Sequence, residues 1–477
     1  MSTTADKSTR LASPQGRHIA RQIVRQAWPN FIAKMIAIAM MIADTLIAGH
    51  YGTQDLAAVA IGSSFYISVI MLLMGTLQSV GPIIAHHVGA KRRADISPAL
   101  QQGFWLAILL SIPGVLILLN PHYLLRLAQV PENVLGGAAD YMAAAAMGLP
   151  ALLLYRTFYE FNNAVGKPRV LMVFSTIVTV VHIPLALVLA HGVMGLPELG
   201  GTGCGVSTAI VNWLALVCCL AYALWDKDYV KYKLFARLHA PSLRAIGQQM
   251  RLGLPMGLST FIDISSFTLI AILVARLGAE TVAGHRVVAN FTGLIYMLPL
   301  SIALATMVLV GHSNGAEDPN RSRLTAKLGL TMAASMGLLI GVVLWFVREP
   351  LIGLSSQDPA VQQVALGLVV YLCLYQFFDG FQTVASYALR GYKVTLVPML
   401  FHTFCFWGIG LCGGYWLSFY APWRNGQPSV QGFWEATVLA TLAASILFGL
   451  LLRRISHLTK CYTQPSITNG QASHPLQ

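Results

Sequence analysis

The sequence predicts an all-α integral membrane protein in which twelve transmembrane helices form two six-helix lobes, related by an internal pseudo-twofold repeat. Of the 477 residues, 56% are hydrophobic and only 10% are charged, whereas about a quarter of the residues in a soluble globular chain are charged. A crossing of the bilayer takes roughly 20 apolar residues, and runs of that length recur along the whole chain. The two halves of the chain also share a colinear residue pattern.

The predicted spans are apolar runs separated by polar segments, and the first of them is not a signal peptide. The run from Trp28 to Gly49 is too long for the apolar core of a cleavable signal peptide, so we expect it to remain as the first span. The predicted spans are 27–49, 57–84, 99–119, 138–158, 168–191, 203–224, 252–275, 284–310, 326–347, 361–388, 395–419 and 432–452.

Basic residues predict the orientation of these spans. The net charge of +13 comes from Lys and Arg residues beside the spans, as the positive-inside rule requires, and does not indicate a nucleic-acid partner. When alternate segments are compared, one side carries nearly all the basic residues, and the other side has only Arg126, Arg276, Arg348 and Arg424. We expect a multi-pass protein of the inner (plasma) membrane with both termini in the cytoplasm.

An internal repeat divides the chain into two lobes. A constant offset of 226 positions pairs Arg25 with Arg251, Pro29 with Pro255, Gly52 with Gly278, His86 with His312, and Gly89 with Gly315. Parallel repeats of this kind, related by an axis along the membrane normal, are a recurrent plan of transporters. The predicted parts are a cytoplasmic N-terminal segment (1–26), an N-lobe (27–224), a cytoplasmic inter-lobe linker (225–251), a C-lobe (252–453) and a polar tail (454–477).

Three carboxylates lie inside predicted spans: Asp44, Asp263 and Asp379. Ionisable groups in the hydrocarbon are costly enough that each is a functional hypothesis. Asp263 and Asp379 lie near mid-span, and helical spacing places polar side chains beside them. These side chains are Ser259, Thr260 and Ser266 around Asp263, and Gln376, Gln382, Thr383 and Ser386 around Asp379.

Oxygen-rich clusters of this kind suit the binding of a coupling ion. A hard cation such as Na⁺ prefers oxygen ligands, and desolvation increases the affinity of a carboxylate for H⁺. The alternative is that each carboxylate only joins neighbouring helices. We expect no cofactor besides H⁺ or Na⁺ and no metal site, since six of the seven cysteines lie in apolar stretches without CxxC spacing.

Aromatic residues and two cations complete the set of intramembrane candidates. The aromatic cleft candidates are Tyr66, Phe261, Phe267, Phe291, Tyr296 and Phe378. Aromatic faces attract organic cations, although the same residues also pack ordinary membrane helices. Arg286 and Lys34 are the intramembrane cations, and Lys34 is near enough to the inner end of its span for a structural, snorkelling role.

Several stretches resemble the multidrug and toxic compound extrusion (MATE) family in its bacterial NorM-type branch. The resemblance covers about residues 20 to 455. It is carried by Asp44–Gly49 (DTLIAG), Asp55–Val59 (DLAAV), Gly200–Ala209 (GGTGCGVSTA), Ala283–Asn290 (AGHRVVAN), Met297–Ile302 (MLPLSI), and Asp379 with Leu389–Lys393 (LRGYK).

The resemblance implies two six-helix lobes around a V-shaped cleft and the export of cationic or amphipathic drugs in exchange for H⁺ or Na⁺. Asp44 and Asp379 fall on functional aspartates of the family, and Asp263 falls where this branch usually has glutamate. Asn163 and His182 stand where the family commonly has an acidic residue and an asparagine, and Arg286 replaces a glutamine. The shorter side chain of Asp263 favours H⁺ over Na⁺ and leaves both open. We expect a monomer that contacts lipids and small organic compounds.

Two alternatives remain at this stage. A lipid-linked oligosaccharide flippase of the same superfamily would need several basic residues for phosphate, and only Lys34 and Arg286 are available inside predicted spans. An intramembrane aspartyl enzyme would use Asp263 and Asp379, but a twofold-repeated plan has no role in such catalysis and no nucleophile motif is present. We therefore expect a transporter and not an enzyme. The absence of a GxxxxGK[ST] motif indicates that an ion gradient supplies the energy.

Overall fold

The computed structural model describes residues 11, 13–127, 130–192, 195, 197–422 and 427–463, and in these ranges the chain is helical without any β-strand. The ends of the predicted N-terminal segment and polar tail, 1–10, 12 and 464–477, lie outside the described residues. The first half contains α1 (Pro14–Tyr51), α2 (Thr53–Leu77), α3 (Val80–Gly89), η2 (Arg93–Asp95), α4 (Ile96–Leu119), α5 (Pro121–Leu127), α6 (Glu132–Ala146), α7 (Leu149–Ala164), α8 (Pro168–His191), α9 (Thr202–Trp225) and α10 (Lys227–Val230). The second half contains α11 (Leu243–Val274), η4 (Ala275–Leu277), α12 (Ala279–Gly315), α13 (Pro319–Ser355), α14 (Pro359–Gly391), α15 (Leu396–His402), the π-helix η5 (Thr403–Gly413), α16 (Gly414–Phe419) and α17 (Gln431–Thr463).

The predicted all-α membrane fold is confirmed. Eleven helical segments of the described chain are long and apolar enough to cross a bilayer, and the pair α6 and α7, bent by 51°, makes twelve when it is counted as one span. Large apolar side chains on the outside are exposed, including Phe346 (79% exposed) and Leu339 (64%). A soluble protein would bury such residues, so lipid is the solvent of this surface.

The helices are longer than the apolar runs that predicted them. α1 already begins at Pro14, where the Ser13 hydroxyl accepts a hydrogen bond of 3.0 Å from the Gly16 backbone N–H. α11 begins at Leu243, within the expected linker, and α17 continues to Thr463. Polar residues continue a helix readily once its end is capped, so hydropathy marks the membrane-embedded part and not the helix ends.

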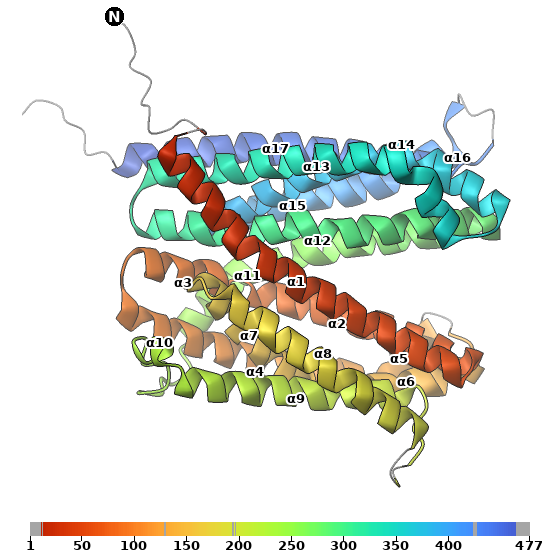
Figure 1. Cartoon of the computed structure of the whole chain (residues 1–477), viewed down its shortest axis with the longest axis horizontal. Helices are drawn as coiled ribbons and strands as arrows, with labels where there is room; N and C mark the ends of the chain where they lie inside the picture. Colours follow the sequence, from red (N-terminus) through yellow and green to blue (C-terminus); the bar gives the residue numbers. More distant parts are fainter. Residues whose placement is uncertain are drawn as a thin grey trace, which may run out of the picture.

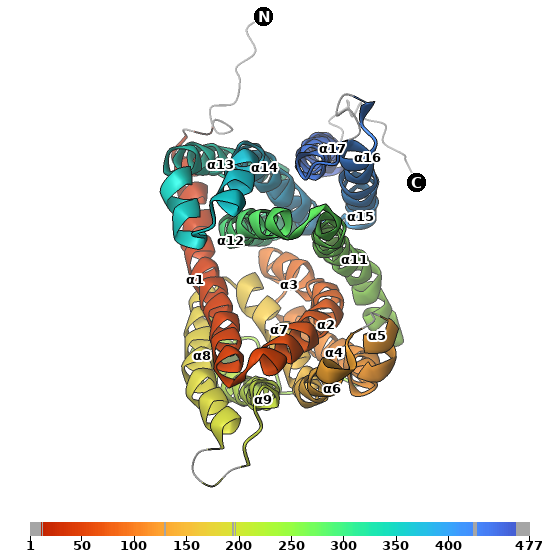
Figure 2. The same cartoon turned by 90° about the vertical axis from the view of Figure 1, so that its right-hand side faces the viewer.

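The two halves repeat each other in space. A shift of 226 positions carries the pair α2 and α3, Thr53–Gly89, onto α12, Ala279–Gly315. α1 packs on α12, and its counterpart α11 packs on α2. Seen along the helices, the spans of each half gather into their own lobe (Figure 2). The structure therefore has the predicted two-lobe, pseudo-twofold arrangement.

Each lobe is linked to the other by the start of its first helix. The Gln249 side-chain amide on α11 donates a 2.9 Å hydrogen bond to the Ala99 carbonyl on α4 of the N-lobe. In the same way α1 contacts α13 of the C-lobe, where Arg321 donates to Gln22 at 3.5 Å. α1 begins and α17 ends at the same end of the molecule (Figure 1), which we call the terminal end.

The lobes meet closely in the half of the molecule near the terminal end. A Cβ atom added to Gly89 would lie 2.0 Å from the His312 carbonyl oxygen, and one added to Gly315 would lie 2.0 Å from the His86 carbonyl oxygen. Nearer the middle, Gly75 would meet the Gly257 Cα atom at 2.6 Å. Only glycine permits such close backbone approach. We call these contacts the inter-lobe seam.

The linker between the lobes is bound to the N-lobe. The Gln101 side-chain amide on α4 donates 2.8 Å hydrogen bonds to the carbonyls of Leu234 and Arg237. One residue further, Gln102 donates to the Ala240 carbonyl at 2.9 Å. Because these irregular backbone carbonyls are satisfied by side chains of α4, the segment after α10 lies fixed on this lobe.

Candidate functional site

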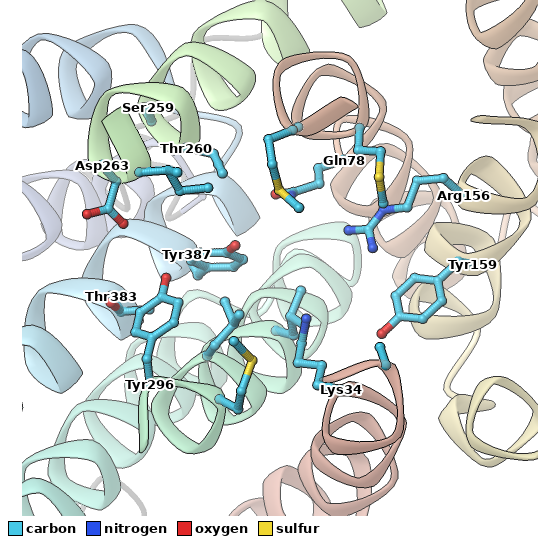
Figure 3. A pocket seen from close by; sticks show the side chains of 18 of the residues that line it. Lys34, Gln78, Arg156, Tyr159, Ser259, Thr260, Asp263, Tyr296, Thr383 and Tyr387 are labelled. Atoms are coloured by element: carbon cyan, nitrogen blue, oxygen red, sulfur yellow. The ribbon is translucent and has the colours of Figure 1, made fainter. Parts of the chain in front are cut away.

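A cavity of about 520 Å³ lies between the lobes. Its walls come from α1, α2 and α7 on the N-lobe side and from α11, α12, α14 and α15 on the C-lobe side. Figure 3 shows Asp263 and Arg156 on opposite sides of this space. The volume falls in the range of pockets that hold drug-sized molecules, about 300–1,000 Å³.

Asp263 reaches the cavity from α11 together with two of its predicted neighbours, Ser259 and Thr260. The two hydroxyls donate to carbonyls of their own helix, Pro255 at 2.9 Å and Met256 at 3.1 Å. Their oxygen lone pairs therefore stay available to a ligand. In the described parts of the chain, Asp263 forms no ion pair, and it lies close enough to Asp379 for the two charges to interact.

Asp379 lies behind the cavity wall in a fully buried polar cluster on α14. The Gln382 side-chain amide donates to the Asp379 carboxylate at 3.0 Å and to the Thr383 hydroxyl at 3.1 Å. Four buried polar atoms of this helix have no hydrogen-bond partner among the described residues: Gln376 Nε2, Asp379 Oδ2, Gln382 Oε1 and Ser386 Oγ. Buried polar atoms without partners destabilise the folded protein unless a proton, an ion or a water molecule binds them. Carboxylate, amide and hydroxyl oxygens are also the donor set that a Na⁺ ion would need.

Ser266 does not belong to the Asp263 cluster, contrary to the prediction from helical spacing. Its hydroxyl donates a 3.1 Å hydrogen bond to the carbonyl of Phe406 in the π-helix η5. Ser266 lies two turns from Ser259 on nearly the same side of α11, but η5 offers it a backbone acceptor at that level. Spacing along α11 does not register this neighbour.

In the N-lobe, Asp44 and His182 form one buried network. The Nε2 atom of His182 on α8 lies 2.7 Å from an Asp44 carboxylate oxygen, and its Nδ1 atom lies 3.0 Å from the Ser207 hydroxyl on α9. His182 is fully buried, and Asp44 is buried as well. The sequence proposed both residues singly, and the structure brings them together and adds Ser207.

Asn163 lies in a different network. Its side-chain carbonyl accepts a 2.9 Å hydrogen bond from Asn30 on α1, which in turn accepts one of 3.0 Å from the Tyr159 hydroxyl. The resemblance implied that Asn163 and His182 both replace residues that the family commonly has at these positions. The structure instead uses Asn163 to join α7 to α1.

Most predicted aromatic cleft residues pack within the lobes. Only Tyr296 of that set lines the described cavity, which is otherwise bordered by Tyr155, Tyr159 and Tyr387. Phe267 packs edge-on against Tyr375 with ring centroids 5.7 Å apart. The remaining candidates were wrongly placed in the cleft, because aromatic residues on these helices also fill the lobe cores: Tyr66 is buried in the N-lobe, Phe291 contacts the C-lobe core, Phe378 packs on Phe377, and Phe261 is not a lining residue.

Three cations line the cavity, and they are not the pair expected. Lys34, Arg156 and Arg390 point into it, whereas Arg286 is exposed on α12 away from the described lining. The position of Lys34 near the end of its span predicted a structural role. Arg156 and Arg390 belong to the basic residues that were expected on the cytoplasmic side. The sequence contains features that could have indicated both arginines as cavity residues. Arg156 has Glu160 one turn later, and Arg390 continues the polar face of α14 four residues after Ser386.

The comparisons with known proteins agree with this architecture. The MatE family profile matches residues 29–188 and 255–416, two segments that start 226 positions apart. A probable multidrug resistance protein NorM from Aromatoleum aromaticum is 58% identical over 444 residues, covering 93% of this chain and 96% of that protein. The multidrug resistance protein PmpM of Pseudomonas aeruginosa is 33% identical over 435 residues, covering 91% of each chain.

A solved structure extends the likeness to the whole fold. The outward-facing conformation of a multidrug resistance MATE family transporter superposes with a TM-score of 0.84, covering 96% of this chain and 100% of that chain at 17% identity. At this identity the likeness concerns the fold alone. The family profile matches more than half of the sequence, and a relative with more than half of its aligned residues identical covers 93% of it, so this chain belongs to the MatE family.

Proposed function

We propose that this protein is a secondary active multidrug efflux antiporter that exports cationic or amphipathic organic compounds in exchange for H⁺ or Na⁺. The observation that carries the proposal is the drug-sized cavity between the lobes, which has Asp263 on its wall and the Asp379 cluster directly behind that wall. A ligand in the cavity and an ion at these carboxylates would interact with the same helices, α11 and α14. Each can therefore favour one state of a single conformational equilibrium.

The arrangement of the seam supports an alternating mechanism. Close glycine contacts hold the lobes together in the half near the terminal end, which we propose to face the cytoplasm of the inner membrane. Export requires that this seam opens to load substrate and closes to release it on the other side. Rigid lobes that rock about a central site are a known solution for proteins built from repeats.

The coupling ion follows from the Asp263 environment. Asp263 has two nearby hydroxyls and no ion pair in the described chain, so a proton needs only this desolvated carboxylate. Na⁺ would need several ligands at fixed distances. We therefore propose H⁺ as the coupling ion. In proteoliposomes, efflux of a fluorescent cation should persist without Na⁺ under an inward pH gradient and collapse with a protonophore. A strict requirement for Na⁺ would reassign Asp263 and Asp379 as sodium ligands.

The orientation has its own test. A single cysteine at Leu238, which is 84% exposed on the linker, in a variant without other cysteines, should resist an impermeant thiol reagent added to intact cells. It should react once the membrane is permeabilised. Labelling in intact cells would reverse the proposed topology.

The argument against a flippase assumed that only Lys34 and Arg286 could bind phosphate. The structure corrects this, since Lys34, Arg156 and Arg390 line the cavity. We still propose drug export, because the relatives of this chain are named multidrug resistance proteins. The basic residues instead bear on which compounds the cavity accepts. We propose no enzymatic reaction for the Asp263 and Asp379 pair.

A further inference from the structure

The cavity carries two cations on its N-lobe wall and charges of both signs on its C-lobe wall. Asp263 lies on the C-lobe wall from α11, and Lys34 and Arg156 lie on the N-lobe wall from α1 and α7 (Figure 3). Arg390, on α14 of the C-lobe wall, is a third cation. Charges in the interior of a membrane protein need compensation, so the partners of each group decide what the cavity still requires.

Two of the three cations already have partners. Arg156 forms an ion pair of 2.5 Å with Glu160, which is fully buried one turn along α7. Arg390 donates a 2.7 Å hydrogen bond to the Gln78 side chain of the other lobe and lies 4.1 Å from the Tyr387 ring centroid. Gln78 is neutral, so the Arg390 charge itself is not cancelled by a carboxylate.

Lys34 has no such partner. Among the described residues it forms no ion pair within 4.0 Å, and the charges that act on it are those of Arg156 and Glu160. Figure 3 shows its amine directed into the cavity. Lys34 and Arg156 carry two positive charges, and Glu160 carries one negative charge. The N-lobe wall is therefore positive.

We propose that Lys34 and Arg156 form an anion subsite, so that the preferred substrates are zwitterionic organic compounds with a carboxylate as well as a cationic group. This inference rests on the proposed drug export and specifies its substrate class. The substrate carboxylate would take charge-assisted hydrogen bonds from Lys34, while the cationic group would lie toward Asp263. A purely cationic compound would meet Asp263 but be repelled by Lys34.

A pair of dyes with one skeleton tests the subsite. Rhodamine 6G is a cation, and rhodamine 19 is the same dye with its ethyl ester replaced by a free carboxylate, hence a zwitterion. The measurement is the ratio of the two dissociation constants, obtained by fluorescence polarisation with purified full-length protein. Lys34→Met removes the charge at similar length, Lys34→Arg keeps it, and Arg286→Gln removes an exposed charge outside the described lining as the matched control.

The wild-type protein should prefer rhodamine 19. Lys34→Met should reverse that preference by about tenfold, because rhodamine 19 loses a charge-assisted contact while rhodamine 6G loses a repulsive neighbour. Lys34→Arg and Arg286→Gln should keep the wild-type ratio. Since rhodamine 6G binding is expected to improve in Lys34→Met, that measurement also shows that the variant is folded.

The possible failures can be told apart. If Lys34→Met leaves the ratio unchanged while rhodamine 6G is still bound and exported, the anion subsite is wrong and drug export stands. An equal change of ratio in Arg286→Gln would also overturn the subsite, because a general surface-charge effect would then explain the preference. Binding of neither dye by the wild-type protein would contradict the proposed function and the subsite together.

Discussion

The two lobes share one backbone plan but use their carboxylates differently. In the N-lobe, Asp44, His182 and Ser207 satisfy one another in a closed chain of hydrogen bonds. In the C-lobe, Asp263 faces the cavity, and the cluster around Asp379 keeps four buried polar atoms without partners in the described structure. A buried unsatisfied group costs about 1–3 kcal/mol. The Asp379 cluster thus retains a binding capacity that the Asp44 network has already used internally.

The largest expected effect tests whether the C-lobe cluster couples the ion. Asp379→Asn should reduce gradient-driven efflux to background, because the amide cannot exchange a proton or supply a full negative charge to Na⁺. The protein should remain folded in the membrane, since asparagine keeps the size of the side chain. Efflux from proteoliposomes measures the effect. The control is Asp358→Asn at the exposed start of the same helix, where asparagine caps equally well.

Full efflux by Asp379→Asn would break the comparison, since the ion would then bind elsewhere. The N-lobe network would be the next candidate, and Asp44→Asn in the same assay would show whether the roles of the lobes are exchanged.

The second prediction concerns the seam, where the lobes should be equivalent. A methyl group at Gly89 or Gly315 would lie 2.0 Å from a carbonyl oxygen of the other lobe. Overpacking costs about 1–3 kcal/mol, so Gly89→Ala and Gly315→Ala should each reduce the ratio of closed-seam to open-seam molecules about tenfold. Spin labels at Arg92 and Arg453, one on each lobe, would report the separation by pulsed electron resonance.

Gly247→Ala is the matched control for the seam, because a Cβ atom at that position meets nothing within 4 Å. Clearly unequal effects of Gly89→Ala and Gly315→Ala would show that the twofold relation of the seam is only approximate in energy.

The third prediction tests whether the N-lobe network is closed. His182→Ala removes both contacts of the imidazole and leaves a buried carboxylate, so unfolding free energy should fall by about 2–3 kcal/mol. His191→Ala, exposed at the end of the same helix, is the control. Thermal unfolding in detergent gives both values. A double-mutant cycle with Asp44→Asn should show a coupling energy of about 1 kcal/mol or more. Independent effects of the two changes would mean that the pair contributes no stability.

The smallest effect sharpens the boundary of the C-lobe cluster. Ser266→Ala removes only the hydrogen bond to the Phe406 carbonyl, which is worth about 0.6 kcal/mol between membrane helices. Efflux by the Ser266→Ala variant should depend on the ion gradient as it does in the wild-type protein. Ser259→Ala, which changes the cavity wall beside Asp263, should alter the pH dependence of efflux. A change of coupling in Ser266→Ala would restore its predicted place in the cluster.

The fold could be predicted from the sequence because membrane insertion depends on long apolar runs and on flanking charge, both of which are local. The offset of 226 even indicated which helices would be equivalent. Helix ends were less accessible to prediction. α11 begins at Leu243 through a Ser242 cap, a feature that hydropathy does not register.

The site was predictable in its carboxylates and less so in its surroundings. A charged residue in an apolar run is conspicuous, whereas Arg390 lies at the end of its span and has the appearance of an ordinary cytoplasmic charge. Its place in the cavity depends on the partner lobe, which supplies Gln78. Aromatic residues carried even less positional information, since both the lobe cores and the cavity use them.

The seam has the form of a contact between two equivalent subunits. His86 meets Gly315, and its repeat counterpart His312 meets Gly89. The pseudo-twofold rotation therefore carries each contact onto the other. Contacts of this reciprocal form are those of a symmetric homodimer. Two identical single-lobe subunits would make the same pair of contacts. Within one chain the two lobes can keep these contacts and still differ elsewhere, as the histidine network and the aspartate cluster do.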